Sequence, residues 1–457
     1  MNKNYDRYGA GAAEDTADDA RQNTDPGDAQ GGAGVVISGA PHWRPRELTK
    51  EYTGDERKRS GVDAPYLALT LLILMIGMIM VLSASFARGY YTNGEPMRVF
   101  TRQLVFAVSG VAIMLIVSRM SVKTMSRWSY MLLFVSFILL VAVIFIGTKV
   151  NGSQRWLGFE GGGGSFSFQP SEIAKLAIIM AFAKWTCDKG QRGMKTFRFG
   201  VLPFVVTTGL IVLLLMREPH ISASIIIIAL AVIMMFAGGA RLIWFAPVAL
   251  VIAALATLLV IVNTNGAARD NISQDIPGQL TQVQWLEGRL EYAGGRIEAW
   301  LDPEKDPLGD GFQIRQSLYA VGSGGLLGQG LGQSRQKYLY LPEEHNDYIF
   351  AVICEELGFI GAMMILMLFA LLIIRGYWLA LHAKSRYSAL VTTGITSLLA
   401  IQVFLNVAVV TNLLPATGIS LPFFSSGGTA LWIQLLQMGI VLAVSRDIPV
   451  YKEEAAP

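Results

Sequence analysis

The chain has little charge and very little cysteine for its length. Only 16% of its 457 residues are Asp, Glu, Lys or Arg, and the formal net charge is +3. So small a basic excess argues against nucleic acid as the main partner. The two cysteines, Cys187 and Cys354, lie in or beside apolar segments. Neither a disulfide framework nor a cysteine metal site is therefore indicated.

Apolar residues are abundant instead, at 53% of the chain, and they fall in long blocks. A block of about 20 apolar residues is long enough to cross the hydrocarbon core of a bilayer. We predict an all-α polytopic membrane protein with about ten transmembrane helices. The expected spans lie near residues 65–86, 99–119, 127–148, 170–187, 199–216, 220–238, 242–263, 347–375, 387–414 and 427–445.

The charged residues between these blocks predict the topology. Lys and Arg gather in alternate short loops, for example around Arg127, Lys189 and Arg241, and the positive-inside bias then places both termini in the cytoplasm. Residues 1–62 are polar, lack the apolar core of a cleaved signal peptide, and are expected to form a disordered cytoplasmic tail.

After this tail we expect a membrane domain over residues 63–446 and a cytoplasmic C-terminal tail over residues 447–457. Within the membrane domain, residues 264–346 form a large extracytoplasmic loop between the seventh and eighth helices. Apolar residues in that loop recur at helical spacing, which predicts amphipathic helices lying on the outer surface. They are Leu280, Val283, Leu286, Leu290, Ile297 and Trp300.

The stretch from Leu341 to Gly358 runs from acids and a histidine straight into an apolar segment. An ionised side chain at the centre of a membrane helix costs about 2.5 to 3.5 kcal/mol on insertion scales, so Asp347, Glu355 and Glu356 need a polar cavity or a task. One interpretation is a solvated loop in which Asn346 or Asp347 is the N-cap of the next helix. The other is that Asp347 is a general base at the mouth of a polar cavity.

Glu355 and Glu356 would lie about two turns deeper than Asp347, with Glu356 nearly opposite it around a helix. We interpret this deeper pair as structural or cavity-forming. A metal site formed by Glu343, His345 and Asp347 matches no strong ligand spacing, so no protein-held metal is predicted. Mg²⁺ or Mn²⁺ carried by a substrate pyrophosphate stays open.

Other polar residues sit at the predicted span ends. Glu172 and Lys175 follow Pro170 at helical spacing and can pair, either as a structural ion pair or as the polar wall of a cavity. Residues 217–220 interrupt two apolar blocks and predict a tight outer turn or a broken helix. Arg155 and Arg217 have the planar, permanently charged group that suits a phosphate.

Glycines are concentrated in the run from Gly322 to Gln333. No Lys-Ser or Lys-Thr pair follows them and no βαβ pattern surrounds them, which argues against a nucleotide loop. We expect a turn or close-approach loop at the membrane surface that could shape a substrate groove.

Four segments together resemble the shape, elongation, division and sporulation (SEDS) family, and within it FtsW more than RodA or SpoVE. They are Asn151–Leu157, Phe166–Leu176, Leu341–Gly358 and Leu413–Gly428. The resemblance implies a peptidoglycan glycosyltransferase that polymerises lipid II into glycan strands at the outer face of the bacterial cytoplasmic membrane. It further implies a role in septal cell-wall synthesis, with a class B penicillin-binding protein and other division proteins as partners.

In the family pattern the aspartate proposed for catalysis matches Asp347. The expected substrate-binding residues are Arg155, Glu172, Lys175, Arg217, Glu218, Glu343, His345, Ser425 and Ser426. The chain departs from the pattern at Glu218-Pro219-His220, where many members have Gln-Pro-Asp, and at Ser426, where many have Tyr. A lipid II flippase, a division scaffold and an elongation or sporulation paralogue are the alternatives.

Overall fold

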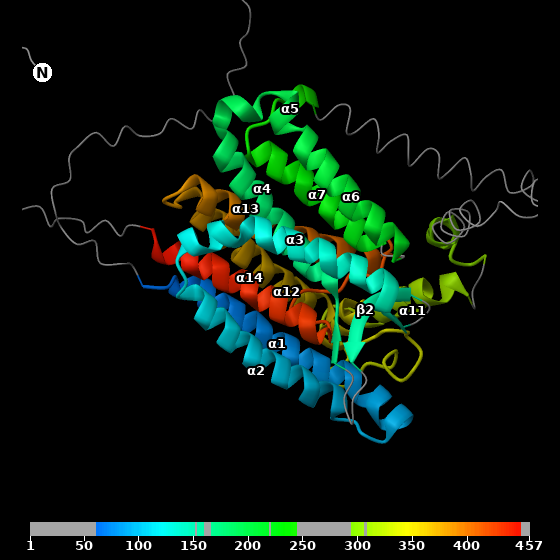
Figure 1. The fold of residues 1–457 in the computed structure, drawn as a ribbon. Coiled ribbons are helices and arrows are strands. Elements are labelled where there is room, and N and C mark those ends of the chain that lie inside the picture. The colour runs from blue at the N-terminus through cyan, green and yellow to red at the C-terminus, as the bar shows by residue number, and fades with distance from the viewer. Residues whose placement is uncertain are drawn as a thin grey trace, which may run out of the picture. The chain divides into compact units, whose positions relative to one another are not determined.

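The computed structural model describes residues 61–150, 153–159, 166–218, 221–244, 294–305 and 309–448. The expected tails, residues 264–293 of the large loop and the span near 242–263 lie almost entirely outside these ranges. Pro219 and His220 lie outside them as well. The described elements are mostly long helices (Figure 1).

The described chain begins with α1 (Ala64–Arg88), a short π-helix (Gly89–Asn93), α2 (Arg98–Ser118) and α3 (Val122–Ile146). It continues through α4 (Pro170–Met194), α5 (Phe197–Gly200), α6 (Leu202–Arg217), α7 (Ile221–Ala237) and a 3₁₀ turn (Leu242–Trp244). A helical segment covers residues 294–301. The remaining helices are α11 (Asp310–Ser323), α12 (Ile349–Leu381), α13 (Arg386–Val410) and α14 (Gly428–Arg446).

These helices coincide with every expected span except the one near 242–263. Among the described residues, seven helices are long and apolar enough to cross a membrane. The shorter α7 has 17 residues, and α4 carries several charged residues. Helices α2, α3 and α12 expose large apolar side chains such as Val108, Phe134 and Met364, whereas α13 and α14 are buried along most of their length. The apolar surface fits contact with lipid.

Local chemistry explains several helix starts. The Asp63 side chain accepts a hydrogen bond from the Tyr66 backbone N–H at 2.9 Å and caps α1. Pro170 occupies the first turn of α4, as predicted, where its missing N–H costs nothing. Ser385 caps α13 by accepting from the Ser388 N–H at 3.1 Å.

Three short strands were not expected in a fully α-helical chain. β1 (Thr148–Val150), β2 (Ser153–Phe159) and β3 (Phe166–Phe168) form an antiparallel sheet in the order β1-β2-β3. Their sequences are rich in aromatic and β-branched residues, which favour strands. This sheet lies between α3 and α4 and contacts both helices.

Polar contacts define two ends of the bundle. At one end Asp63 binds Arg375 of α12 and Ser445 of α14. At the other end Arg88 at the end of α1 binds Glu344, just before α12. Figure 1 shows α1, α2 and α14 side by side, with β2 and α11 near the second end. We call this second end the Asp347 end.

Candidate active site

Asp347 lies in the loop that precedes α12. The N-cap of α12 is Tyr348, and no side chain caps the helix. The interpretation of Asn346 or Asp347 as a side-chain cap is therefore wrong. Because the helix begins at Ile349, Asp347 is not on a helical face, and helical periodicity does not relate it to Glu356.

The backbone of Asp347 is fixed by α13. Asn406 donates hydrogen bonds from Nδ2 to the Asp347 carbonyl at 2.8 Å and to the Ile419 carbonyl at 2.7 Å. The loop after α13 thereby reaches the carboxylate, and a Cβ on Gly418 would stand 3.0 Å from Asp347 Oδ2. Gly418 has φ +65°, which glycine adopts without strain. A larger residue at position 418 would crowd the Asp347 carboxylate, which explains the glycine.

The two serines of the same loop hold the segment before Asp347. Ser425 Oγ donates to the Asn346 carbonyl at 2.7 Å. Ser426 donates from its backbone N–H to the His345 carbonyl at 3.0 Å and from its hydroxyl to Asn346 Oδ1. Their hydroxyls position the loop, so substrate contact by Ser425 and Ser426 stays a prediction.

The charges around Asp347 set its protonation. Burial, together with the negative charge of Glu343, raises the pKa of the Asp347 carboxyl to about 6. Arg155, Arg296 and His345 act in the opposite direction. The carboxylate is thus mostly ionised at neutral pH and more basic than an exposed aspartate. Glu343 accepts a hydrogen bond from Asn346 Nδ2 at 2.6 Å, which places it within the same loop.

Arg296 was not among the residues expected from the sequence. It belongs to the helical segment 294–301, and its guanidinium donates to the Ala416 carbonyl at 2.5 Å. Trp300 of the same segment donates to the Asn412 carbonyl at 3.0 Å. The only sequence signal was the neighbouring Ile297 and Trp300, whose spacing predicts a helix but says nothing of where it docks.

A cavity of about 160 Å³ lies beside this arginine. It is lined by Arg296, Ala299, Gly309, Phe312, Gln313, Ile314, Pro342 and Ala416. Pro342 and Ala416 belong to the two loops that meet at Asp347. The cavity combines apolar walls with a cation and an amide, and its volume is below the roughly 300 to 1,000 Å³ usual for a small-molecule site.

Arg155 and Glu218 form a second pair of ionisable side chains. Arg155 stands on β2 and lowers the pKa of both Asp347 and Glu218. Burial is nevertheless the dominant effect on Glu218, whose pKa is raised to about 8. Glu218 is buried and follows the C-terminus of α6, while the neighbouring Arg217 is exposed. Arg155 and Glu218, both predicted to bind substrate, therefore lie close enough for the charge of Arg155 to affect the pKa of Glu218.

Glu172 and Lys175 form the ion pair that their spacing predicts. Lys175 Nζ lies 2.7 Å from Glu172 Oε1, and both side chains are largely buried. The pair belongs to the first turns of α4, which contacts β2. This contact favours the structural interpretation of the pair over an open polar wall.

A further acid of the loop, Glu344, is tied to α1 and to its neighbour His345. Glu344 is fully buried and accepts two hydrogen bonds of 2.8 Å from the Arg88 guanidinium. His345 Nδ1 lies 3.5 Å from Glu344 Oε1. Arg88 was missed because it lies 256 residues from Glu344. Within the described ranges, no group of three or more His, Cys, Asp or Glu side chains could hold a metal.

Residues 64–448 match the sequence family described as cell cycle proteins FtsW, RodA and SpoVE. The chain belongs to this family. Stage V sporulation protein E of Bacillus subtilis is 40% identical over 391 residues, which cover 85% of this chain and 98% of that protein. The probable peptidoglycan glycosyltransferase FtsW of Trichlorobacter lovleyi is 37% identical over 388 residues, covering 84% and 93%.

Solved structures carry the same SEDS fold. A structure described as structural coordination of polymerization and crosslinking by a peptidoglycan synthase complex matches with a TM-score of 0.63 and 27% identity, over 84% of this chain and 98% of that one. Rod shape determining protein RodA of Thermus thermophilus matches with a TM-score of 0.56 over 85% and 97%, at 24% identity. The resemblance of the four sequence segments is confirmed at the level of the SEDS family.

Proposed function

We propose that this SEDS protein is a peptidoglycan glycosyltransferase that polymerises lipid II, with Asp347 as its general base. The observation that carries the proposal is a carboxylate of raised pKa beside Arg155 and Arg296 at one end of a membrane bundle. A general base works best when its pKa lies near the working pH. The activity itself is named for the FtsW relatives.

The proposed reaction joins two sugars and releases a lipid pyrophosphate. The C4 hydroxyl of the acceptor N-acetylglucosamine attacks the anomeric carbon of the donor N-acetylmuramic acid. Its proton passes to the Asp347 carboxylate, the bond to the pyrophosphate breaks, and the anomeric centre inverts.

The departing pyrophosphate takes up negative charge and needs cationic stabilisation. Arg155 and Arg296 lie close enough to Asp347 to lower its pKa, which places their positive charge beside the proposed base. We therefore assign the leaving group to the two arginines first. Arg217 and a substrate-borne Mg²⁺ or Mn²⁺ are further candidates.

Asp347→Asn tests the proposal. Loss of a general base typically costs about 10²- to 10⁴-fold in rate, so the purified variant should bind lipid II yet make almost no glycan. Glycan length is measured by gel electrophoresis, with the wild type shown active in the same preparation. Full polymerisation by the variant would remove Asp347 from the mechanism.

The flippase alternative needs a polar path for the lipid headgroup through the bundle. Glu172, Lys175, Glu355 and Glu356 are the polar residues of the spans that would line such a path, and each binds a partner inside the protein. Because these side chains are engaged within the protein and are not open to a headgroup, the contacts support the enzyme over the flippase. Glycan formed from lipid II already on the outer face, with no flipping step, would separate the two activities.

We propose septal synthesis as the cellular role and a class B penicillin-binding protein as the partner. The relatives include a sporulation protein at 40% and FtsW proteins at 33–37% identity. A fluorescent fusion should gather at the division site. Side-wall or prespore localisation would instead support the elongation or sporulation role.

A further inference from the structure

The helix that follows Asp347 is broken nine residues after it starts. Gly358 in α12 has φ +67° and ψ −171°, so the helical hydrogen bonds cannot continue through it. Backbone of the glycine-rich run enters the break: Gln329 and Gly330 donate to the carbonyls of Glu355 and Glu356 at 2.9 and 3.0 Å. Phe359 donates to Gly325 at 2.9 Å.

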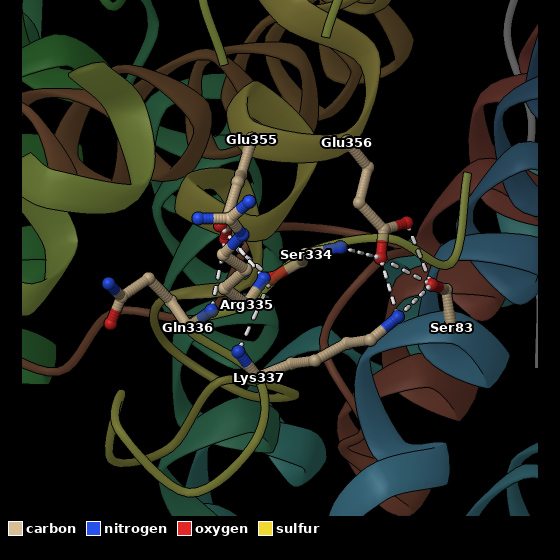
Figure 2. Close-up of polar contacts among 7 residues, drawn as sticks. All are labelled: Ser83, Ser334, Arg335, Gln336, Lys337, Glu355 and Glu356. Carbon is tan, nitrogen blue, oxygen red and sulfur yellow. Dashed lines mark hydrogen bonds and ion pairs between the residues drawn. The ribbon is translucent and has the colours of Figure 1, made fainter. Parts of the chain in front are cut away.

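Two acids stand on the short piece of α12 before the break and hold the chain that returns to Asp347. Glu355 accepts hydrogen bonds from the backbone N–H groups of Arg335 at 2.9 Å and Gln336 at 3.3 Å. The Ser334 hydroxyl donates to the same carboxylate. Figure 2 shows Glu355 meeting Ser334, Arg335 and Gln336 at one place.

Glu356 extends this contact to the first helix. Its Oε1 lies 2.8 Å from Lys337 Nζ, and both side chains are buried. Ser83 of α1 donates to the Glu356 carboxylate at 2.7 Å and accepts from Lys337 at 3.3 Å. The three side chains close a ring, visible in Figure 2, that joins α1, the loop and α12.

The segment 334–348 is therefore held at both ends. Its start is bound by Glu355 and Glu356, and its end by the Arg88–Glu344 pair three residues before Asp347. A buried ion pair contributes little net stability, because desolvation offsets its attraction, but it can select one conformation. The network is thus better suited to fixing the loop than to strengthening the bundle.

We propose that Lys337 and Glu356 are positioning residues for the reaction, which hold segment 334–348 so that the Asp347 carboxylate meets the acceptor hydroxyl. The proposal rests on the proposed glycosyltransferase function. Small displacements of a reacting group are costly, and about 1 Å can lower a rate about 10²-fold. Neither side chain needs to touch the substrate.

The double variant Lys337→Met/Glu356→Gln tests this without leaving a buried unpaired charge. The matched control is Asp63→Asn/Arg375→Met, which removes the ion pair joining α1 and α12 at the opposite end of the bundle. With lipid II as substrate, we expect the first variant to lose about 10- to 100-fold in kcat with little change in KM. The control should keep the wild-type kcat.

The pH profile adds a readout that general loss of stability would not move. A loosened loop hydrates Asp347, and since burial is the main cause of its raised pKa, the acid limb of kcat should move to lower pH. Arg155, Arg296, His345 and Glu343 are the charged groups that act on Asp347, and of these only His345 and Glu343 belong to the loop and would shift with it. An unchanged kcat and profile, or an equal loss in the control variant, would overturn the proposal.

A measurement independent of activity separates this inference from the proposed function. Backbone hydrogen exchange of the intact protein in detergent should rise over residues 334–348 in Lys337→Met/Glu356→Gln and stay at the wild-type level in the control. Unchanged exchange contradicts the positioning role. An inactive wild type with the expected exchange pattern contradicts the glycosyltransferase proposal alone.

Discussion

Asp347 owes its chemistry to its surroundings rather than to its residue type. An exposed aspartate has a pKa of about 3.9 and is a weak base. Burial and Glu343 raise the pKa of Asp347 to about 6, while Arg155 and Arg296 keep it from rising further. The proposed function assigns the same two arginines to the pyrophosphate, so that one cluster would serve both the proton and the leaving group.

The activity of the protein should fall in acid with an apparent pKa near 6, because only the ionised carboxylate can accept a proton. Glu343→Gln removes a nearby negative charge, lowers the pKa of Asp347 and should move this limb to lower pH. The measurement is kcat/KM for lipid II against pH. Exposed Glu95→Gln is the matched control and should leave the limb in place.

Glu218 should make the protein less stable in base. Its pKa in the fold is about 8, above the ordinary 4.5, so the folded state keeps a proton that the unfolded chain loses. Stability therefore falls as pH rises from about 4.5 to about 8, and stays low above that range.

Glu218→Gln should abolish this dependence and raise the unfolding temperature in detergent, most clearly at pH 8. A pKa unit corresponds to about 1.4 kcal/mol, so the rise of the pKa from 4.5 to about 8 limits the gain to about 5 kcal/mol. Thermal scans at pH 5 and pH 8 check it. An equal unfolding temperature for both proteins at pH 8 would mean that Glu218 is not protonated in the fold.

At the scale of elements, the break in α12 governs how the loop reaches the site. Unsatisfied backbone groups are costly within a membrane, and irregular backbone persists there only where protein buries it. The run from Gly324 to Gly330 provides this cover, because its glycines let two backbones touch. The absence of side chains is what makes the contact possible.

Gly358→Ala should destabilise the protein strongly. Its φ of +67° disfavours alanine by about 1 to 2 kcal/mol, and the new Cβ would collide with the backbone N of Gly328. Gly324→Ala should behave alike, since its Cβ would meet the Cys354 carbonyl.

The control is Gly322→Ala, whose Cβ would meet nothing within 4 Å. Expression level and unfolding temperature in detergent are the measurements. A Gly358→Ala protein as stable as Gly322→Ala would show that the break is not required.

At the scale of the molecule, the helix bundle has two chemically different ends. Asp63, Arg375, Arg446 and Ser118 meet at one end, whereas Arg88, Glu344, Asp347 and Ser426 meet at the other. A substrate in the outer leaflet can meet the Asp347 carboxylate only if the Asp347 end of the bundle lies at that leaflet. The proposed function thus requires the Asp347 end to face outward.

Cysteine labelling checks this orientation. In a background lacking Cys187 and Cys354, Gly94→Cys, between α1 and α2, should react with a membrane-impermeant maleimide added outside intact spheroplasts. Lys384→Cys, between α12 and α13, should react only after permeabilisation. The reverse pattern would place the site in the cytoplasm and exclude polymerisation on the outer face.

Local pattern determined much of this protein. Long apolar blocks predicted the described helices because span length is set by the bilayer, and the spacing of Glu172 and Lys175 predicted their pair because neighbours three residues apart share a helix face. The Leu341–Gly358 stretch pointed to Asp347, because an acidic side chain beside an apolar span is costly unless a polar cavity or a function accounts for it. The strands were missed, since β1 and β3 have only three residues each and the seven residues of β2 show no clear alternation of apolar and polar side chains.

Tertiary structure alone decided what each charge does. Arg88 meets Glu344, Ser83 meets Glu356 and Arg296 comes beside Asp347 across long stretches of chain, and no local spacing encodes such encounters. The raised pKa of Asp347 and the anchoring of its loop by Glu355 and Glu356 arise from that packing. The sequence supplied the ionisable groups, and burial together with their neighbours fixed their protonation and their roles.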